Sequence, residues 1–296
     1  MKISVALATY NGEKFIIEQL ESIYKQTKQP DEVIISDDHS TDKTKDLVAD
    51  YISSHNLSRW SVIDNELSNG ITNNFINALQ HTSGDIIFLC DQDDVWEPEK
   101  VENIVSAFEN KTECVISAIK YIDQDGRLIN EKTAYTNNKD HIVGLSELCC
   151  VCSYLGMSSA FRRNVIEATT ESFMRSTSHD WALMVKASNI GEIKYIGQAV
   201  QKYRQHSNNA SVIKNGSRRE NRLSFIQRQL CIMCNSKEYV CENADQDILK
   251  SYEGFAKKRI NWIKNRSFIS IIMNIKNYRR LKYTSRNILA DLVASL

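Results

Sequence analysis

Proline is scarce in this chain, with only Pro30 and Pro98 among its 296 residues. A proline-rich linker between domains is therefore excluded. No apolar run approaches the roughly 20 residues that a membrane-spanning helix needs. The first nine residues turn polar too early for a secretory signal peptide. We therefore expect a cytoplasmic protein with one large core, or with one domain plus an appendage.

Glycine-rich phosphate-binding motifs are also missing from the sequence. Neither G-x-G-x-x-G nor G-x-x-x-x-G-K-[ST] follows the first apolar run, Ile3–Thr9. A bound nucleotide would therefore be held by a metal and side chains rather than by a glycine cradle. The eight cysteines add no metal-binding pattern. Cys231 and Cys234 have C-x-x-C spacing without a second pair, and their helical context predicts buried, reduced thiols.

The net charge is zero, but the charges are unevenly distributed. Residues 1–213 hold 20 Lys and Arg against 30 Asp and Glu, a balance of −10, and residues 214–296 hold 17 against 7, a balance of +10. This contrast predicts a boundary near 214–216 and different neighbours for the two parts. We expect a first domain over 1–213, with halves of 1–110 and 111–213. A basic helical region is expected over 214–296.

The first hundred residues alternate between short apolar runs and helical stripes, which predicts a mostly parallel sheet with right-handed crossovers. A mixed sheet is expected to follow, and from about residue 218 the pattern is helical to the end. Ser40 or Thr41 is expected to cap the second helix. The runs that predict strands are Ile3–Thr9, Val33–Ile35, Trp60–Ile63, Ile86–Cys90, Cys114–Ile119 and Lys194–Arg204.

Three carboxylates follow the apolar run Ile86–Cys90 directly, at Asp91, Asp93 and Asp94. Open α/β sheets bind ligands at the carboxyl ends of their strands. Crowded carboxylates repel each other unless a cation lies among them. Oxygen ligands favour Mg²⁺ or Mn²⁺, and Mg²⁺ is typically shared with substrate phosphates. The stretch therefore predicts a metal–diphosphate site, with a solvated acidic turn as the alternative.

Polar segments follow the predicted strands in a fixed order. They are Ala8-Thr9-Tyr10-Asn11-Gly12, Ser36-Asp37-Asp38-His39-Ser40-Thr41-Asp42, Asn69-Gly70 and Asp91-Gln92-Asp93-Asp94-Val95-Trp96. Over roughly residues 1–210, this order resembles the family 2 glycosyltransferases, which have the GT-A nucleotide-diphospho-sugar transferase fold. The last segment and the later Tyr203-Arg204-Gln205-His206 look most like bacterial rhamnosyltransferase-type members that build surface polysaccharide.

The resemblance implies that 1–213 is a catalytic domain, with a nucleotide-binding half (1–110) and an acceptor half (111–213). It also implies that these segments bind a nucleotide-sugar. Asp38 is expected to accept the N3–H of uracil or thymine in a charge-assisted bond, and Asp37 to support it or contact the ribose. The alternative is that both carboxylates stabilise a helix N-terminus. The other residues expected at the donor are Thr9, Tyr10, Asn11, Asn69, Gly70, Asp91 and Arg204, the last as a counter-charge for the diphosphate.

Asp91 and Asp93 match the D-x-D motif of the resembled family. Asp93 is expected to bind Mn²⁺ or Mg²⁺ directly, Asp91 to face the ribose or the metal, and Asp94 to support them. His206 is expected to complete the metal shell or contact the diphosphate, with an ordinary surface histidine as the alternative. Such a metal neutralises the leaving group as the sugar bond breaks.

His179-Asp180-Trp181 matches the acceptor-side motif of the family, in which the Asp is the general base. His179 stands where many members have Glu. The alternative is that Asp180 caps the helix that begins at Trp181. The segment that includes Gly156 and Ser158 resembles the donor–acceptor junction, where small residues let a sugar approach the backbone. One base without a second donor-side carboxylate predicts a single in-line displacement with inversion, by the stereochemical logic known for hydrolases.

The resemblance implies an enzyme that moves a sugar from a UDP- or dTDP-linked donor, dTDP-rhamnose being one candidate, to a hydroxyl of a growing, lipid-linked surface glycan such as O antigen or capsule. A sugar-nucleotide pyrophosphorylase would need a basic, glycine-rich loop after the first strand. A phosphatase with an Asp nucleophile would carry its D-x-D there. An inactive scaffold or carbohydrate-binding relative is the non-enzymatic rival, and the presence of all the expected carboxylates argues against it.

The basic stretch 257–286 frames the apolar segment Phe268–Met273 with Lys and Arg, and with Trp262, Tyr278 and Tyr283. This pattern fits a helix in a membrane interface, on the inner face of the cell membrane, where anionic headgroups attract cations. The alternatives are packing on the catalytic domain or on a second subunit in a homodimer. No nucleic-acid-binding motif is evident. The basic residues are Lys257, Lys258, Arg259, Lys264, Arg266, Lys276, Arg279, Arg280, Lys282 and Arg286.

Overall fold

The chain divides into two compact units, one of Met1–Val143 with Leu155–His206 and one of Gly144–Tyr154 with Ser207–Leu296. The predicted boundary near 214–216 lies outside the described residues, so the predicted domain limits stay a prediction. Cys149, Cys150 and Cys152 lie outside them too. The computed structural model describes residues 1–134, 139–145, 147–148, 154–206, 217–237, 243–281, 283 and 285–296.

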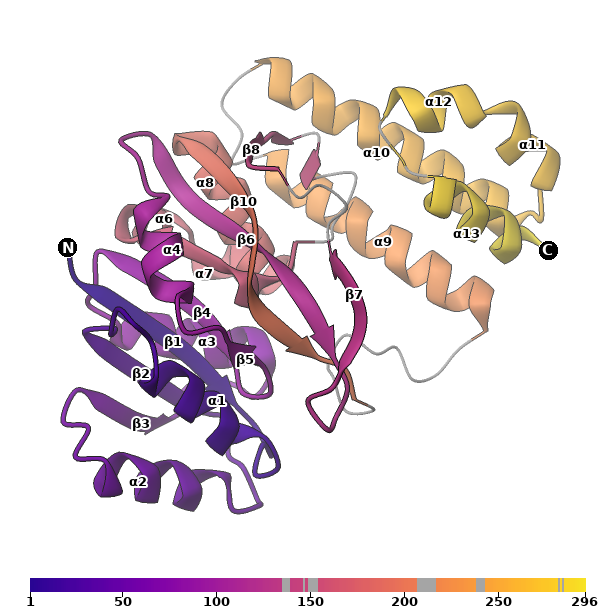
Figure 1. Ribbon diagram of the computed structural model, residues 1–296. Helices are drawn as coiled ribbons and strands as arrows, with labels where there is room; N and C mark the ends of the chain where they lie inside the picture. Colours follow the sequence, from indigo (N-terminus) through magenta and orange to yellow (C-terminus); the bar gives the residue numbers. More distant parts are fainter. Residues whose placement is uncertain are drawn as a thin grey trace. The chain divides into compact units, whose positions relative to one another are not determined.

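Within the described residues, the first unit is built on a ten-stranded sheet (Figure 1). Its first half has the parallel order β3-β2-β1-β4. The predicted parallel strands are confirmed. Strands β1 and β4 are continuous apolar runs because both of their faces are covered. The bounds are β1 Ile3–Thr9, β2 Glu32–Asp37, β3 Trp60–Asp64 and β4 Ile86–Asp91.

The second half of the sheet is mixed, as expected from the sequence. Strand β9 pairs antiparallel with both β4 and β6, and β10 then runs parallel to β6. The short strands β5 and β8 pair antiparallel with β10, and β7 pairs antiparallel with β6. The bounds are β5 Val95–Trp96, β6 Thr112–Ile122, β7 Leu128–Ala134, β8 His141–Val143, β9 Ser159–Arg162 and β10 Glu192–Arg204.

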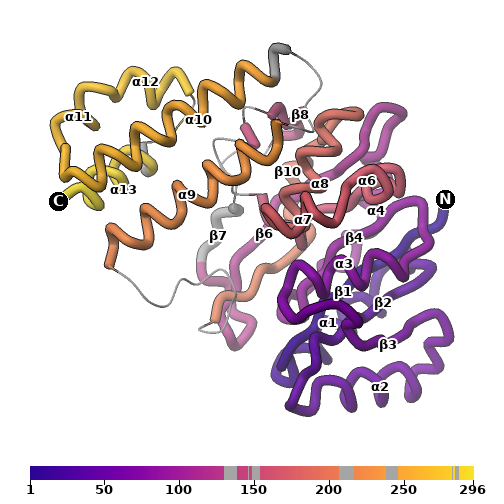
Figure 2. Tube along the Cα trace, turned by 180° about the vertical axis from the view of Figure 1, so that it is seen from behind, coloured from indigo at the N-terminus to yellow at the C-terminus, as the bar shows by residue number. Residues whose placement is uncertain are grey.

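Helices cover both faces of this sheet. Helices α1 and α4 lie in front of it in Figure 1, whereas α3, α7 and α8 lie behind it and come forward in the reversed view of Figure 2. Helix α1 buries Ile16, Leu20 and Ile23, the spacing of an amphipathic helix. The bounds are α1 Ile16–Tyr24, α2 Thr44–Ser54, α3 Ile71–His81, α4 Lys100–Ser106, η1 (a 3₁₀ turn) Gly156–Ser158, α6 Arg163–Ala168, α7 Glu171–Ser176 and α8 His179–Ile190.

The expected cap of the second helix by Ser40 or Thr41 is wrong. Helix α2 begins later, at Thr44, and its first turn follows Asp42. The Asp42 Oδ1 atom accepts the Thr44 N–H at 3.0 Å. The Ser40 hydroxyl donates instead to Asp37, at 2.6 Å. The loop after β2 is therefore longer than the sequence pattern indicated, and its polar side chains fold back on the strand end.

The second unit consists mainly of helices. Helix α13 packs against α9, α10 and α11. Cys231 and Cys234 are exposed thiols on α9, so the prediction that they are buried is wrong. Among the described helices, none has the length and apolar character that a membrane crossing requires. The bounds are α9 Arg218–Ser236, α10 Asn243–Lys264, α11 Phe268–Met273, α12 Ile275–Arg280 and α13 Ser285–Ser295.

A buried ionic cluster holds the helices of the second unit together. The Asp291 carboxylate on α13 accepts from the guanidinium of Arg259 on α10 at 2.6 Å and from that of Arg222 on α9 at 2.5 Å. The Tyr278 hydroxyl donates to the same carboxylate at 2.6 Å. Both Asp291 and Arg259 are fully buried, and Tyr283 is buried beside them. Arg259, Tyr278 and Tyr283 are therefore core residues. The expectation that they belong to a membrane-facing surface is wrong.

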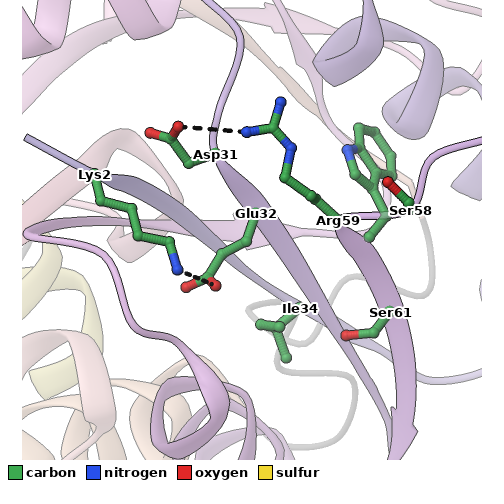
Figure 3. Close-up of a pocket in the computed structure, with 8 residues that line it drawn as sticks. Lys2, Asp31, Glu32, Ile34, Ser58, Arg59 and Ser61 are labelled. Atoms are coloured by element: carbon green, nitrogen blue, oxygen red, sulfur yellow. Dashed lines mark hydrogen bonds and ion pairs between the residues drawn. The ribbon is translucent and has the colours of Figure 1, made fainter.

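A hollow of about 320 Å³ lies at the amino ends of β1, β2 and β3 (Figure 3). Two ion pairs cross it, Lys2 with Glu32 at 2.9 Å and Arg59 with Asp31 at 3.6 Å. Its charged groups therefore neutralise each other. The predicted site residues Thr9 and Asp37 lie at the opposite, carboxyl ends of β1 and β2.

Candidate active site

The register of the parallel strands brings the predicted segments together. Thr9 is the partner of Asp37 across β1 and β2, and Ala8 is the partner of Asp91 across β1 and β4. The loops after β1, β2 and β4 therefore start side by side. This is the edge at which open α/β sheets form ligand crevices.

Asp37 is a buried organiser of the loop that follows β2. Its carboxylate accepts from the Thr9 hydroxyl at 2.8 Å, from the Ser40 N–H at 2.7 Å and from the Ser40 hydroxyl at 2.6 Å. These bonds join the ends of β1 and β2. Both Asp37 and Asp38 lie well before α2, so neither belongs to the first turn of that helix.

Asp38 is nearly buried, with one hydrogen bond to each carboxylate oxygen. Oδ1 accepts from the Asn65 side chain at 2.7 Å, and Oδ2 accepts from the Gly70 N–H at 2.8 Å. Each oxygen has a second lone pair, so the carboxylate retains capacity for a ligand N–H. Gly70 has a φ of 126°, which only glycine adopts readily, and it caps α3 directly after the exposed Asn69.

Gln92 fixes the loop after β1, a role that the sequence analysis missed. Its side-chain amide exchanges two hydrogen bonds of 2.9 Å with the backbone of Tyr10. The Tyr10 side chain itself is 54% exposed at the edge of the site. Asn11 accepts the Thr41 N–H at 2.8 Å and so links the loops after β1 and β2. In the sequence, Gln92 lies between Asp91 and Asp93, and this pattern does not indicate that its amide binds the backbone of another loop.

Asp91, Asp93 and Asp94 form one carboxylate cluster, because an oxygen from each lies within 4.8 Å of the others. Asp91 and Asp93 are half-buried and Asp94 is fully buried. The His206 Nε2 atom lies 2.7 Å from Asp93 Oδ2, so the structure brings these two predicted metal ligands together. Asp94 accepts from the Gln201 side chain at 2.6 Å and from the Arg204 N–H at 3.0 Å.

Burial dominates the electrostatics of this cluster. It raises the pKa of Asp91 to about 7, and the neighbouring Asp93 and Asp180 carboxylates raise it further. Burial together with Asp93 and Asp91 also holds the pKa of Asp94 well above its usual range. Converging carboxylates with unfavourable mutual repulsion and an adjacent imidazole are a donor set that suits Mg²⁺ or Mn²⁺. The residues present therefore fit a divalent cation.

The predicted donor residue Arg204 is almost fully buried and holds internal contacts. Its Nε atom donates to the Asp93 carbonyl at 2.8 Å, and a terminal nitrogen lies 2.5 Å from Glu18. The guanidinium also lies over the Phe15 ring, 4.8 Å from its centroid. Arg204 thus fixes the backbone of the carboxylate cluster, and its contact with a diphosphate stays a prediction.

Asp180 lies in the first turn of α8. Its Oδ1 atom accepts from the Ser178 hydroxyl at 2.6 Å and from the Trp181 N–H at 2.8 Å. The capping alternative is wrong, because α8 begins at His179 with Ser178 as its N-cap residue, and Asp180 lies inside the helix. Its Oδ2 atom has no hydrogen bond among the described residues and faces Gly156. A Cβ on Gly156 would lie 2.6 Å from that of Asp180, so only glycine allows this approach. The Asp180 carboxylate also contributes to the raised pKa of Asp91.

The other acceptor-side residues are buried around Asp180. His179 stacks on Phe75 with 4.0 Å between ring centroids, and burial lowers its pKa. Within the described part of the chain, neither His179 Nδ1 nor Trp181 Nε1 has a hydrogen-bond partner. Ser158 is buried, and its hydroxyl donates to the Leu155 carbonyl at 2.7 Å.

Lys100 was not predicted as a site residue, because a lysine at the start of a helix is usually solvated. It is fully buried. Its ammonium donates to the Met157 carbonyl at 2.9 Å and to Gln201 Oε1, and it lies 3.9 Å from the centroid of the Trp96 ring. Burial lowers the pKa of Lys100 to about 7.

The half-parallel, half-mixed sheet with carboxylates at the end of β4 defines a GT-A transferase fold. Residues 1–349 of the S. aureus protein TarS, solved with UDP-GlcNAc, have the same fold, with a TM-score of 0.65 at 19% identity over 100% of this chain and 90% of that fragment. The mannosyltransferase PcManGT from Pyrobaculum calidifontis, solved with GDP-Man and Mn²⁺, gives a TM-score of 0.60 at 16% identity, over 99% of this chain and 85% of that protein.

The sequence profile of glycosyl transferase family 2 matches residues 4–170, so the chain belongs to that family. The predicted resemblance and fold class are confirmed. The dTDP-rhamnosyl transferase RfbG of Shigella flexneri is 28% identical over 69% of this chain and 72% of its own length. Escherichia coli chondroitin synthase is 27% identical over 77% of this chain, but the match spans only 32% of that longer enzyme.

Proposed function

We propose that this enzyme is an inverting, metal-dependent glycosyltransferase that uses a UDP- or dTDP-linked sugar. One observation carries the proposal. The cluster of Asp91, Asp93 and Asp94 lies at the carboxyl end of β4, and Asp180 is near enough to raise the pKa of Asp91. A charged diphosphate site and a candidate base therefore share one edge of the sheet.

The donor end of the site would bind the nucleotide through residues on three loops. Asp38 retains lone pairs for the N3–H of uracil or thymine, and Thr9 and Tyr10 flank it from β1. Mn²⁺ or Mg²⁺ would be held by Asp91, Asp93 and His206, and when bound it neutralises charge on the leaving diphosphate. The mutual repulsion of the carboxylates gives the cluster its affinity for a cation.

Asp180 would act as the general base at the acceptor hydroxyl. Its Oδ1 atom is held by Ser178 and Trp181, which orients the carboxylate, while Oδ2 keeps its lone pairs for a proton. Removal of that proton makes the acceptor oxygen a nucleophile that attacks the anomeric carbon opposite to the diphosphate. One displacement of this kind inverts the anomeric configuration.

The name of one relative supports the proposed donor. RfbG carries the name of a dTDP-rhamnosyl transferase, which supports dTDP-rhamnose as a donor here. Both pyrimidine bases present the same N3–H, so Asp38 accepts either one. We propose a surface glycan as the acceptor, carried on a lipid at the inner face of the cell membrane.

A surface of the second unit supports peripheral membrane contact. This surface is smaller than the predicted one, which included the whole stretch 257–286. Helix α11 exposes the side chains of Phe268, Ile269, Ile272 and Met273, with Ile269 at 70% and Met273 at 78%. Exposed Lys and Arg residues precede and follow this short helix in the sequence. Apolar side chains fringed by cations suit an anionic lipid interface. These cations are Lys264, Arg266, Lys276, Arg279 and Arg280.

The substitution Asp93→Asn tests the metal-dependent transfer. It removes one charge from the cluster and weakens the bond to His206, so we expect an intact fold and a turnover at least ~100-fold lower. Turnover is measured with the nucleotide-sugar that gives the largest thermal shift in the presence of Mn²⁺, since a ligand at ~100 times its Kd adds about 2.7 kcal/mol. Asp125→Asn, in an exposed turn, is the control. Unchanged turnover in Asp93→Asn, or in excess chelator, contradicts the proposal.

A further inference from the structure

A buried ammonium with uncharged partners marks Lys100 as unusual. Lysine is almost never fully buried unless it is paired, because desolvation of its charge is costly. The hydrogen-bond partners of Lys100 are the Met157 carbonyl and the Gln201 amide oxygen, and the Trp96 ring lies below it. The fold therefore holds a charge at a position where an apolar side chain would be cheaper.

The first contact of Lys100 sets the orientation of Gln201. An ammonium only donates hydrogen bonds, so Gln201 must turn its oxygen toward Lys100. Its Nε2 atom then faces Asp94 and donates at 2.6 Å. Without the ammonium, the amide can rotate and present its oxygen to the carboxylate. Lys100 therefore decides, through Gln201, where the Asp94 oxygens point within the carboxylate cluster.

The second contact of Lys100 reaches the acceptor side. Met157 lies in the η1 turn, directly after Gly156, against which the Asp180 side chain packs. The bond of 2.9 Å from Lys100 to the Met157 carbonyl fixes this turn. One ammonium thus touches both the turn beside the candidate base and the side chain that orients the carboxylate cluster.

We infer that Lys100 is a positioning residue that holds the η1 turn in a fixed position relative to the carboxylate cluster. The inference rests on the proposed function, because it concerns the same cluster and the same candidate base. Lys100 itself touches neither the donor nor the acceptor in this scheme. It acts through Gln201 on Asp94 and through Met157 on the surroundings of Asp180.

The test compares Lys100→Met with Ile104→Val, a buried substitution on the same helix that leaves the polar network intact. The Kd of Mn²⁺ is measured in the presence of UDP and of dTDP, from the electron paramagnetic resonance signal of free Mn²⁺. Asp94 is a neighbour of the proposed ligands Asp91 and Asp93, and disturbing a group that surrounds the ligands of a metal typically weakens metal binding by 10–100-fold. We expect a Kd at least ~10-fold higher in Lys100→Met and an unchanged Kd in Ile104→Val.

The outcomes separate the inference from the proposed function. A wild-type protein that fails to bind Mn²⁺ with either nucleotide overturns the metal site and this inference with it. Wild-type binding with an unchanged Kd in Lys100→Met overturns only the role of Lys100, as does an equal loss in Ile104→Val. Should Lys100→Met fail to fold, Gln201→Met interrupts the same connection, and a Mn²⁺ Kd within ~2-fold of wild type in that variant overturns the inference.

Discussion

At the scale of single residues, the site is defined by carboxylates that the fold holds close together although their charges repel each other. Asp91, Asp93 and Asp94 lie beside one another, and desolvation together with the neighbouring carboxylates raises the pKa of Asp91 and of Asp94. A protein without function would gain stability by neutralising them. Unfavourable charge arrangements of this kind are typical of functional sites, where a bound ligand can offset the repulsion.

Asp91→Asn is expected to stabilise the metal-free protein in a pH-dependent manner. The folded pKa of about 7 lies above the unfolded value of 3.8, so ionisation of Asp91 costs stability as pH rises through this window. Below pH ~4 the carboxyl is neutral in both states and the variant should match wild type. Near pH 8 its Tm in EDTA should be several degrees higher. A Tm difference that is the same at both values contradicts this electrostatic account.

Asp180→Asn separates the base from a donor contact. An amide keeps the bonds from Ser178 and Trp181 but accepts no proton, so kcat should fall at least ~100-fold. The Kd of UDP should stay within about 2-fold of wild type. Glu171→Gln on the neighbouring helix α7 is the control. A loss of nucleotide affinity as large as the loss of rate would show that Asp180 is a donor contact or a structural residue.

At the scale of elements, the regular parts of the fold were predictable and the side-chain network was not. Continuous apolar runs and amphipathic stripes suffice to predict β1, β4 and α1, because the period of a pattern depends only on local residues. The burial of Lys100 depends on Met157 and Gln201, which lie 57 and 101 residues away along the chain. The same holds for the contacts of Arg204 with Glu18 and for the Gln92 amide. Neighbouring letters of the sequence carry no signal for such contacts.

Gly156→Ala tests the close approach of η1 and α8. The added methyl group would lie 2.6 Å from the Asp180 Cβ atom, so the turn and the helix must move apart. We expect kcat to fall at least ~10-fold and the Tm to fall by a few degrees, because overpacking typically costs 1–3 kcal/mol. Gly144→Ala, where a Cβ meets no atom within 4 Å, is the matched control. Full activity in Gly156→Ala would mean that Asp180 tolerates displacement.

At the scale of the whole molecule, the chain combines two units of opposite charge balance. The balance of +10 over residues 214–296 overstates the charge that is free to meet a partner. Arg259 is neutralised inside the second unit by Asp291, which also binds Arg222. Some of the exposed cations lie along the chain around α11, and others lie on α9 and α10, such as Arg228 and Lys250. The composition alone could not separate the exposed cations from the buried ones.

Liposome flotation of the full chain tests the membrane surface. Ile269→Ser with Met273→Ser removes two exposed apolar side chains of α11, and full burial of each is worth about 1.5–3 kcal/mol. We expect binding to anionic liposomes to fall at least ~10-fold, whereas Leu128→Ser with Ile129→Ser, two exposed apolar residues of β7, should bind like wild type. Equal flotation of both double variants, or no flotation of the wild type at low salt, contradicts the membrane contact.

The antiparallel strand β9 has a consequence for how enzymes of this kind diversify. It pairs with β4 in the opposite direction, so its amino end, preceded by η1, adjoins the strand end that carries Asp91. Under the proposed function, the residues that would bind the nucleotide follow β1, β2 and β4, whereas the turn beside the candidate base precedes β9. Substitutions around η1 and α8 would then change the choice of acceptor and leave β1 to β4 unaltered. Enzymes of this arrangement would keep their donor while their acceptor varies.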